Sequence, residues 1–203
     1  PIWMMDRVAA ALQRDGAAPG KAVAIVGAPT IAYALAFLGA VRAGSAATPI
    51  APSSTPEQIA AMIADCGAPI AFLDDAAREA LAGHSIPAKI VGFGAFDQWL
   101  APEGAVPDPV TTASNDAFNI IYSSGTTGTP KGIVQPHGMR WAHVVRAQRY
   151  GYGPDSVVLL STPLYSNTTL VAFFPALARG GHVHLMAKFD ALAYLTQAQA
   201  LRA

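Results

Sequence analysis

The sequence has few charged side chains. Only 13% of its 203 residues are Asp, Glu, Lys or Arg, about half of the share in a typical soluble domain. The 13 basic and 13 acidic residues cancel, so the protein has no excess positive charge to attract nucleic acid or anionic lipid. We therefore expect neither of them as a partner. The scarcity of charge also predicts that part of the surface is covered by protein outside this sequence.

Cysteine is nearly absent, and the histidines do not form a metal motif. The single Cys66 excludes a disulfide framework and any paired-cysteine metal or redox site. His182 and His184 would share one face of a strand, but no Cys, Asp or Glu accompanies them at ligand spacing. We expect no protein-bound metal in this sequence. Because no basic-then-apolar leader follows Pro1, the expected location is cytoplasmic.

No apolar run is long enough and continuous enough to predict a membrane span. Residues 22–41 carry no charge over 20 positions, which is nominally sufficient to cross a bilayer. However, Gly27-Ala28-Pro29-Thr30 interrupts this run. We expect a buried strand at 21–27 and a helix that begins at Thr30 as its N-cap and ends near Ala43.

The pattern that is present is an alternation of helices and strands. Before an irregular, proline-rich connection at 101–115, helices are expected at 2–14, 30–43, 56–67 and 74–82, and strands at 21–27, 45–50, 69–73 and 89–92. After it, strands are expected at 117–122, 132–135, 157–161 and 182–186, and helices at 137–150, 165–179 and from about 190. Pro175 should kink or end its helix. The prediction is an α/β fold with layered, mostly parallel sheets flanked by helices, in two halves of about 1–100 and 116–203.

One loop stands out between two apolar strands: Ser123-Ser124-Gly125-Thr126-Thr127-Gly128-Thr129-Pro130-Lys131-Gly132. Glycines let backbone N–H groups approach an anion, hydroxyls donate hydrogen bonds, and Lys131 adds a positive charge. These properties favour phosphate binding. A flexible linker is the plainer alternative, but linkers seldom end in Pro-Lys-Gly between apolar strands.

Two common nucleotide motifs do not fit this loop. In the P-loop pattern G-x-x-x-x-G-K-[ST] counted from Gly125, Pro130 takes the place of the second glycine, and Gly132 replaces the Ser or Thr. The dinucleotide pattern G-x-G-x-x-G fails because Gly125 and Gly128 are three residues apart and a strand follows the loop.

The loop resembles the phosphate loop of the AMP-forming adenylating superfamily, which includes acyl-CoA synthetases, adenylation domains of peptide synthetases and luciferases. That pattern is [ST]-[ST]-G-T-[ST]-G-x-P-K-G, and every position from Ser123 to Gly132 matches it. Residues 41–50, Val-Arg-Ala-Gly-Ser-Ala-Ala-Thr-Pro-Ile, and residues 162–165, Thr-Pro-Leu-Tyr, extend the resemblance. It implies the N-terminal part of an acyl-adenylate-forming fold, acting on fatty or aromatic acids.

The resemblance implies roles for particular residues. Lys131 and Thr126 would be catalytic. The ATP phosphates would be bound by Ser123, Ser124, Gly125, Thr126, Thr127, Gly128, Thr129 and Lys131. The expected substrates are a small carboxylic acid, ATP and coenzyme A. Mg²⁺ is expected as well, with its protein ligand outside this sequence.

Two further stretches are candidates for an acyl pocket or gate. His137 lies where the resembled family often has a histidine after the loop, although a histidine is also tolerated at a helix start. Tyr165-Ser166-Asn167 lies where many of these enzymes have an aromatic residue followed by His. Here Ser166 replaces that His, and Ser166 or Asn167 could simply cap a helix.

Several parts of the resembled enzymes are missing from the sequence. No Tyr-Gly-x-Thr-Glu stretch for adenine and Mg²⁺ occurs, and the only acids after Lys131 are Asp155 and Asp190. We therefore expect an N-terminal portion, inactive alone, whose partner is the missing C-terminal part of the same enzyme; a homo-oligomer is left open. Two alternatives remain: an adenylation domain that loads a carrier protein, and a non-catalytic module that binds a nucleotide or a partner.

Overall fold

The computed structural model describes residues 2–123 and 130–203. Its first unit consists of α1 (Ile2–Arg14), β1 (Ala22–Val26), α2 (Ile31–Arg42) and β2 (Ala46–Ile50). Thr30 is the N-cap of α2, as expected, and its side chain accepts a hydrogen bond from the Tyr33 backbone N–H. The uncharged run at 22–41 is thus divided between a buried strand and a helix. No helix in the described ranges is long and apolar enough to cross a membrane.

The second unit consists of α3 (Pro56–Asp65), β3 (Ile70–Leu73), α4 (Asp75–Ala80) and β4 (Lys89–Gly92). Thr55 and Gln58 form a capping box at the start of α3, with Pro56 in the first turn. Two short helical segments that the sequence did not predict, η1 (Phe93–Ala95) and α5 (Phe96–Trp99), follow β4. Their aromatic rings pack on Phe72 of β3. Packing therefore stabilises helices that are too short for sequence periodicity to reveal.

The third unit begins with the hairpin of β5 (Ala117–Ser123) and β6 (Lys131–Pro136). It continues into α6 (His137–Ala147) and η2 (Gln148–Tyr150), so the predicted helix at 137–150 ends in a 3₁₀ turn. The chain then forms β7 (Val157–Leu160), α7 (Asn167–Ala178), β8 (His182–Leu185) and α8 (Ala191–Leu201). Helix α7 continues for three residues past Pro175.

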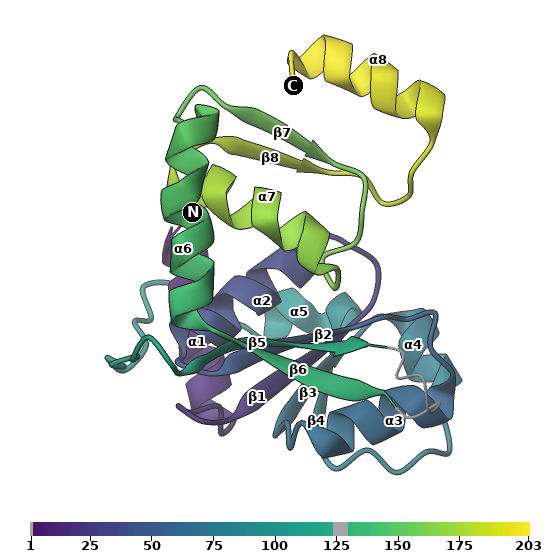
Figure 1. Cartoon of the computed structure of the whole chain (residues 1–203). Coiled ribbons are helices and arrows are strands. Elements are labelled where there is room, and N and C mark those ends of the chain that lie inside the picture. The colour runs from purple at the N-terminus through teal and green to yellow at the C-terminus, as the bar shows by residue number, and fades with distance from the viewer. Residues whose placement is uncertain (1, 124–129) are drawn as a thin grey trace.

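The strands form two sheets (Figure 1). The larger has the order β4-β3-β1-β2-β5-β6, and only the β5–β6 pair is antiparallel. The smaller is the parallel pair β7–β8. The prediction of mostly parallel sheets flanked by helices is confirmed. The larger sheet takes strands from both of the predicted halves, because β5 pairs with β2 at Asn119 and Ala47.

Both faces of the larger sheet are covered, which explains why β1, β2 and β3 are buried at every position. Val23 and Ile25 belong to the core that α1, α2 and α7 complete. Ala24 and Val26 belong to the core on the opposite face, which α3 completes. Helix α7 also packs on the smaller sheet and thereby joins the two sheets through one core.

Candidate functional site

The β5–β6 hairpin brings together the two ends of the phosphate-loop motif. Ser123 and Lys131 face each other in the antiparallel register, and both are exposed. Ser124, Gly125, Thr126, Thr127, Gly128 and Thr129, which complete the predicted phosphate-binding set, lie outside the described residues. A hydroxyl group and a cationic side chain therefore lie side by side at the open end of the hairpin.

This end of the hairpin lies at the carboxyl edge of the larger sheet. Strand β5 runs parallel to β2, and β2 runs parallel to β1, so Ser123 lies at the edge where β1 and β2 also end. In open α/β sheets, ligands bind outside the carboxyl ends of the strands. The position of Ser123 and Lys131 is therefore that of a ligand-binding site.

Tyr165, Ser166 and Asn167 lie at the start of α7, directly after β7 and the buried Leu164. The Thr162 and Thr169 hydroxyls are 2.6 Å apart and tie the first turn of α7 to the end of β7. Ser166 occupies the N-cap position, but its side chain makes no capping hydrogen bond. Its hydroxyl group is therefore not used by the helix, and Asn167 is exposed.

Tyr33 belongs to the same core as Leu164, the residue before Tyr165. It lies in the first turn of α2, which follows the carboxyl end of β1, and is completely buried. Burial raises the pKa of Tyr33, and the nearby Tyr165 raises it further. The Tyr33 hydroxyl has no hydrogen-bond partner within residues 2–123 and 130–203. Tyr33 was not among the residues predicted for the site, because its one signal in the sequence is a hydroxyl group within an apolar run.

His137 lies at the opposite end of the hairpin. Its neighbour Pro136 pairs with Ala117, six residues before Ser123 on β5, which corresponds to about 20 Å at about 3.4 Å per residue. The imidazole packs edge-on against Phe118 with ring centroids 5.0 Å apart. Burial lowers the pKa of His137, and Asp116 opposes that effect. The structure does not bring His137 to the Ser123–Lys131 end, which favours its interpretation as a helix-start residue.

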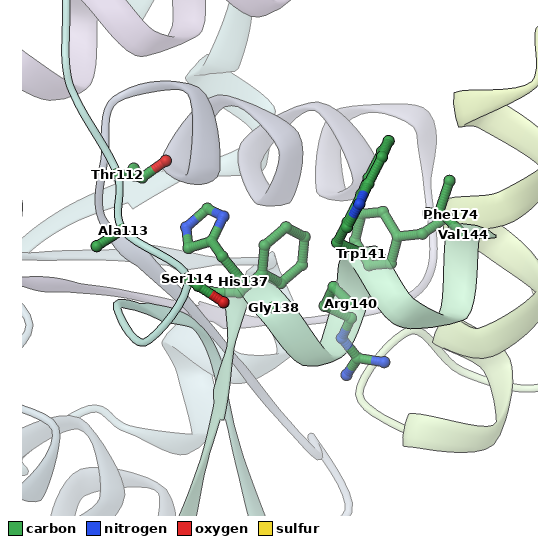
Figure 2. A pocket seen from close by; sticks show the side chains of 10 residues that line it. Thr112, Ala113, Ser114, His137, Gly138, Arg140, Trp141, Val144 and Phe174 are labelled. Atoms are coloured by element: carbon green, nitrogen blue, oxygen red, sulfur yellow. The ribbon is translucent and has the colours of Figure 1, made fainter. Parts of the chain in front are cut away.

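A pocket of about 340 Å³ lies beside His137 (Figure 2). Its walls come from the 112–114 segment, from β5, from the first two turns of α6, and from the second half of α7. They are formed by Thr112, Ala113, Ser114, Phe118, His137, Gly138, Arg140, Trp141, Val144 and Phe174. The pocket is mainly apolar, but it lies at the end of the hairpin away from Lys131. A role for it in acyl binding therefore stays a prediction.

Arg140 forms a buried polar cluster that the sequence did not reveal. Its guanidinium donates to Asn119 Oδ1 from Nε at 3.1 Å and from Nη2 at 3.0 Å, and Nη2 also donates to Gln135 Oε1. Burial lowers the pKa of Arg140 to about 10, so it stays charged at neutral pH. Figure 2 shows the guanidinium pointing away from the His137 imidazole. The cluster therefore fixes α6 to both strands of the hairpin.

The described residues offer no cluster for a resident metal ion. No group of three or more His, Cys, Asp or Glu residues in the ranges 2–123 and 130–203 could hold one. His182 and His184 are both exposed on β8 and share one face of that strand. These two histidines are therefore described as surface residues of β8.

Comparison with known proteins decides the family. The model of the family described as AMP-binding enzyme matches residues 4–202. The chain belongs to the AMP-binding enzyme family. The resemblance read from residues 41–50 and 123–132 is thereby confirmed.

Individual members of the AMP-binding family cover the chain almost completely. AMB antimetabolite synthetase AmbB of Pseudomonas aeruginosa is 32% identical over 184 residues, which are 88% of this chain and 14% of that protein. 4-Coumarate–CoA ligase 5 of Oryza sativa is 32% identical over 203 residues, with coverage of 93% and 38%. The chain thus spans less than two fifths of the length of either relative.

A solved structure shows the same fold. ATP-bound MatB from Rhodopseudomonas palustris superposes with a TM-score of 0.85 at 24% identity, covering 98% of this chain and 41% of MatB. At this identity the similarity concerns the fold alone. The sequence relatives include both a coenzyme A ligase and a synthetase of another kind, so membership in the family leaves the acceptor of the acyl group open.

Proposed function

We propose that this chain belongs to an AMP-forming acid–thiol ligase and supplies its phosphate-binding part. The observation that carries the proposal is the placement of Ser123 and Lys131 together at the carboxyl edge of the sheet, at the two ends of a full phosphate-loop motif. In the first step, a carboxylate oxygen of the substrate attacks the α-phosphorus of ATP. The bond to the bridging oxygen of the β-phosphate breaks, and acyl-adenylate and pyrophosphate form.

Lys131 and the loop hydroxyls act on charge that develops in this step. Negative charge accumulates on the departing pyrophosphate, and a positioned ammonium group with hydroxyl donors stabilises it. We assign this role to Lys131 and Ser123, and by the motif to Thr126. In the second step, the coenzyme A sulfur attacks the acyl carbonyl carbon, and AMP leaves with the bonding electron pair.

Mg²⁺ does not fit the described residues as a protein-held ion. Such an ion needs oxygen ligands, usually carboxylates and phosphates, and the described ranges lack a carboxylate cluster.

The acid is proposed to bind near Tyr165, Ser166 and Asn167. They lie at the start of α7, directly after Leu164, which shares a core with Tyr33 at the carboxyl end of β1. The Ser166 hydroxyl is left unused by the helix cap and is neutral at any physiological pH.

A second candidate function is an adenylation domain that passes the acyl group to a carrier protein. The similarity to AmbB favours this second function, because AmbB is a synthetase much longer than this chain and the match covers a small part of it. A non-catalytic binding module and a cytoplasmic location stay predictions.

Pyrophosphate exchange tests the proposal. The full-length protein should catalyse exchange of labelled pyrophosphate into ATP only when a suitable carboxylic acid is present. Product analysis with coenzyme A or with a phosphopantetheinylated carrier protein then separates the two acceptors. Absence of exchange across a broad panel of aliphatic and aromatic acids would refute the adenylation function.

A further inference from the structure

Tyr122 connects the hairpin to helix α3. It lies on β5, one residue before Ser123, and its hydroxyl oxygen lies 2.5 Å from Asp65 Oδ2 and 3.2 Å from the Met62 carbonyl oxygen. Asp65 is the last residue of α3 and is 57 residues away in the sequence. Burial raises the pKa of Tyr122, and the hydrogen bond to Asp65 raises it further. The hydroxyl therefore remains a protonated donor at physiological pH.

The ring of Tyr122 also lies against β6. Tyr122 pairs with Gly132 in the register, next to the pair of Ser123 and Lys131. A Cβ atom at Gly132 would lie 3.2 Å from Tyr122 Cε1 and Cζ, and 3.1 Å from Ile120 Cγ2. Gly132 is not among the glycines with positive φ. A side chain at this position would therefore be in tight contact with the ring, and glycine leaves the ring its space.

A single side chain thus holds both strands at the point where the loop leaves and re-enters the sheet. The ring packs on β6 at Gly132, and the hydroxyl is bound to the end of α3. The lysine side chain is long and flexible, so the position of its ammonium group depends first on where the backbone holds its Cα atom. A displacement of about 1 Å in positioned groups can slow a reaction about 100-fold.

We propose that Tyr122, Gly132 and Asp65 form a hairpin clamp that positions Lys131 and Ser123 for the triphosphate. The clamp rests on the proposed adenylation function. Tyr122 is a positioning residue in this arrangement, because the contacts that define its role are with Asp65 and Gly132. Loss of its hydroxyl should reduce the reaction without removing any group that would contact ATP.

The experiment uses four single variants of the full-length protein, and the double variant Tyr122→Phe with Asp65→Ala, in the acid-dependent exchange assay. Tyr122→Phe removes the hydroxyl and keeps the ring, Asp65→Ala removes the acceptor, and Asp65→Asn keeps an acceptor oxygen. Tyr150→Phe is the matched control, because Tyr150 is 74% exposed at the end of η2. For each variant, kcat, KM for ATP, KM for the acid and the thermal midpoint are measured.

Tyr122→Phe and Asp65→Ala should each lower kcat/KM for ATP about tenfold, because each removes the hydrogen bond between Tyr122 and a charged acceptor. The effect should not be larger, since Asp65 is exposed to solvent. The double variant should be no slower than either single variant. Asp65→Asn should retain most of the activity, and KM for the acid should not change. A merely structural role would lower the thermal midpoint while leaving the kinetics of the folded protein, measured well below it, unchanged.

Two results would overturn the inference, and they are distinguishable. If the wild type exchanges pyrophosphate and both Tyr122→Phe and Asp65→Ala stay within twofold of Tyr150→Phe, the clamp is refuted and the proposed function stands. If the wild type shows no exchange with any acid, the proposed function fails and the clamp fails with it. Should Tyr122→Phe not fold, the exposed Asp65 tests the same hydrogen bond without altering the packed ring.

Discussion

Replacing Lys131 by alanine should slow adenylate formation about 30-fold. A unit charge about 4 Å from a phosphate oxygen contributes about 1 kcal/mol in bulk water and about 4 kcal/mol at the effective dielectric constant of a protein surface. Lys131 is exposed at the open end of the hairpin, so we expect a value between these limits, about 2 kcal/mol. That value corresponds to about 30-fold in rate.

The assay for this prediction is single-turnover formation of acyl-adenylate by the full-length protein with a saturating acid. Lys131→Arg keeps the charge and should recover part of the rate, whereas Lys131→Gln should resemble Lys131→Ala. Lys21→Ala is the matched control, because Lys21 is also exposed but precedes β1 at the amino end of the strands. Since Lys131 is exposed, its replacement should change the free energy of unfolding by less than about 0.5 kcal/mol.

Either of two results would refute the electrostatic reasoning. A rate for Lys131→Ala within twofold of that of Lys21→Ala would mean that Lys131 is only structural. A loss far beyond about 1000-fold would exceed what one charge can contribute at this distance. In that case Lys131 would have to take a direct chemical part in the step.

Three further predictions concern the described residues. Burial raises the pKa of Asp15, but hydrogen bonds from Arg14, Lys89 and Trp99 outweigh it and hold that pKa at about 2 instead of the ordinary 3.8. Asp15→Asn should therefore lower the unfolding free energy by about 2 kcal/mol above about pH 4. This loss should vanish as the pH falls through about 2, where Asp15 is protonated in the folded protein as well. Urea titrations measure the loss, with the exposed Asp155→Asn as the control. Ser166→Ala should leave the thermal midpoint unchanged, because the hydroxyl caps nothing, but should change KM for the acid; a loss of about 1 kcal/mol in stability would instead support the cap interpretation. Thr169→Val should lower the unfolding free energy by about 1 kcal/mol in urea titrations, since it leaves the Thr162 hydroxyl without its partner at 2.6 Å, and an unchanged midpoint would contradict this role.

The local features of the fold could be predicted because their causes lie within a few residues. Thr30 caps its helix through the N–H three residues later, and Thr55 with Gln58 does the same from both directions. The hairpin was predictable because the loop between two apolar strands is short. The helix predicted at 165–179 is two residues shorter at its start and one at its end, because Ser166 has the extended backbone of an N-cap residue and α7 is Asn167–Ala178.

The arrangement of these elements could not be predicted, because it depends on distant contacts. The pairing of β5 with β2 joins Asn119 to Ala47 across the irregular connection at 101–115. The cluster of Arg140, Asn119 and Gln135 requires a charged helix residue to turn inward, where sequence patterning would place it at the surface. No residue close in sequence indicates either this strand pairing or this buried cluster.

The candidate site was predictable in its chemistry but only partly in its geometry. The motif identified Lys131 and Ser123, and the structure brings them together. The same reasoning grouped His137 with Tyr165 as pocket candidates. The six residue pairs of the hairpin separate His137 from the loop end, whereas Leu164, which precedes Tyr165, belongs to the same core as Tyr33 in the first turn of α2. Proximity in sequence to a motif therefore did not indicate proximity in space.

The last two residues of the motif, Lys131 and Gly132, suit their positions for different physical reasons. Lys131 is exposed at the open end of the hairpin, where its charge is available to an anion. Gly132 is not among the glycines with positive φ and lies against the Tyr122 ring, where a Cβ atom would be in tight contact at 3.2 Å. Both residues belong to the phosphate-loop motif, but of the two only Lys131 is among the residues that the sequence predicts to bind the phosphates. The structure indicates that one residue can serve the ligand, while the other makes room for the side chain that connects the hairpin to α3, so a complete motif match identifies a site without assigning a role to each residue in it.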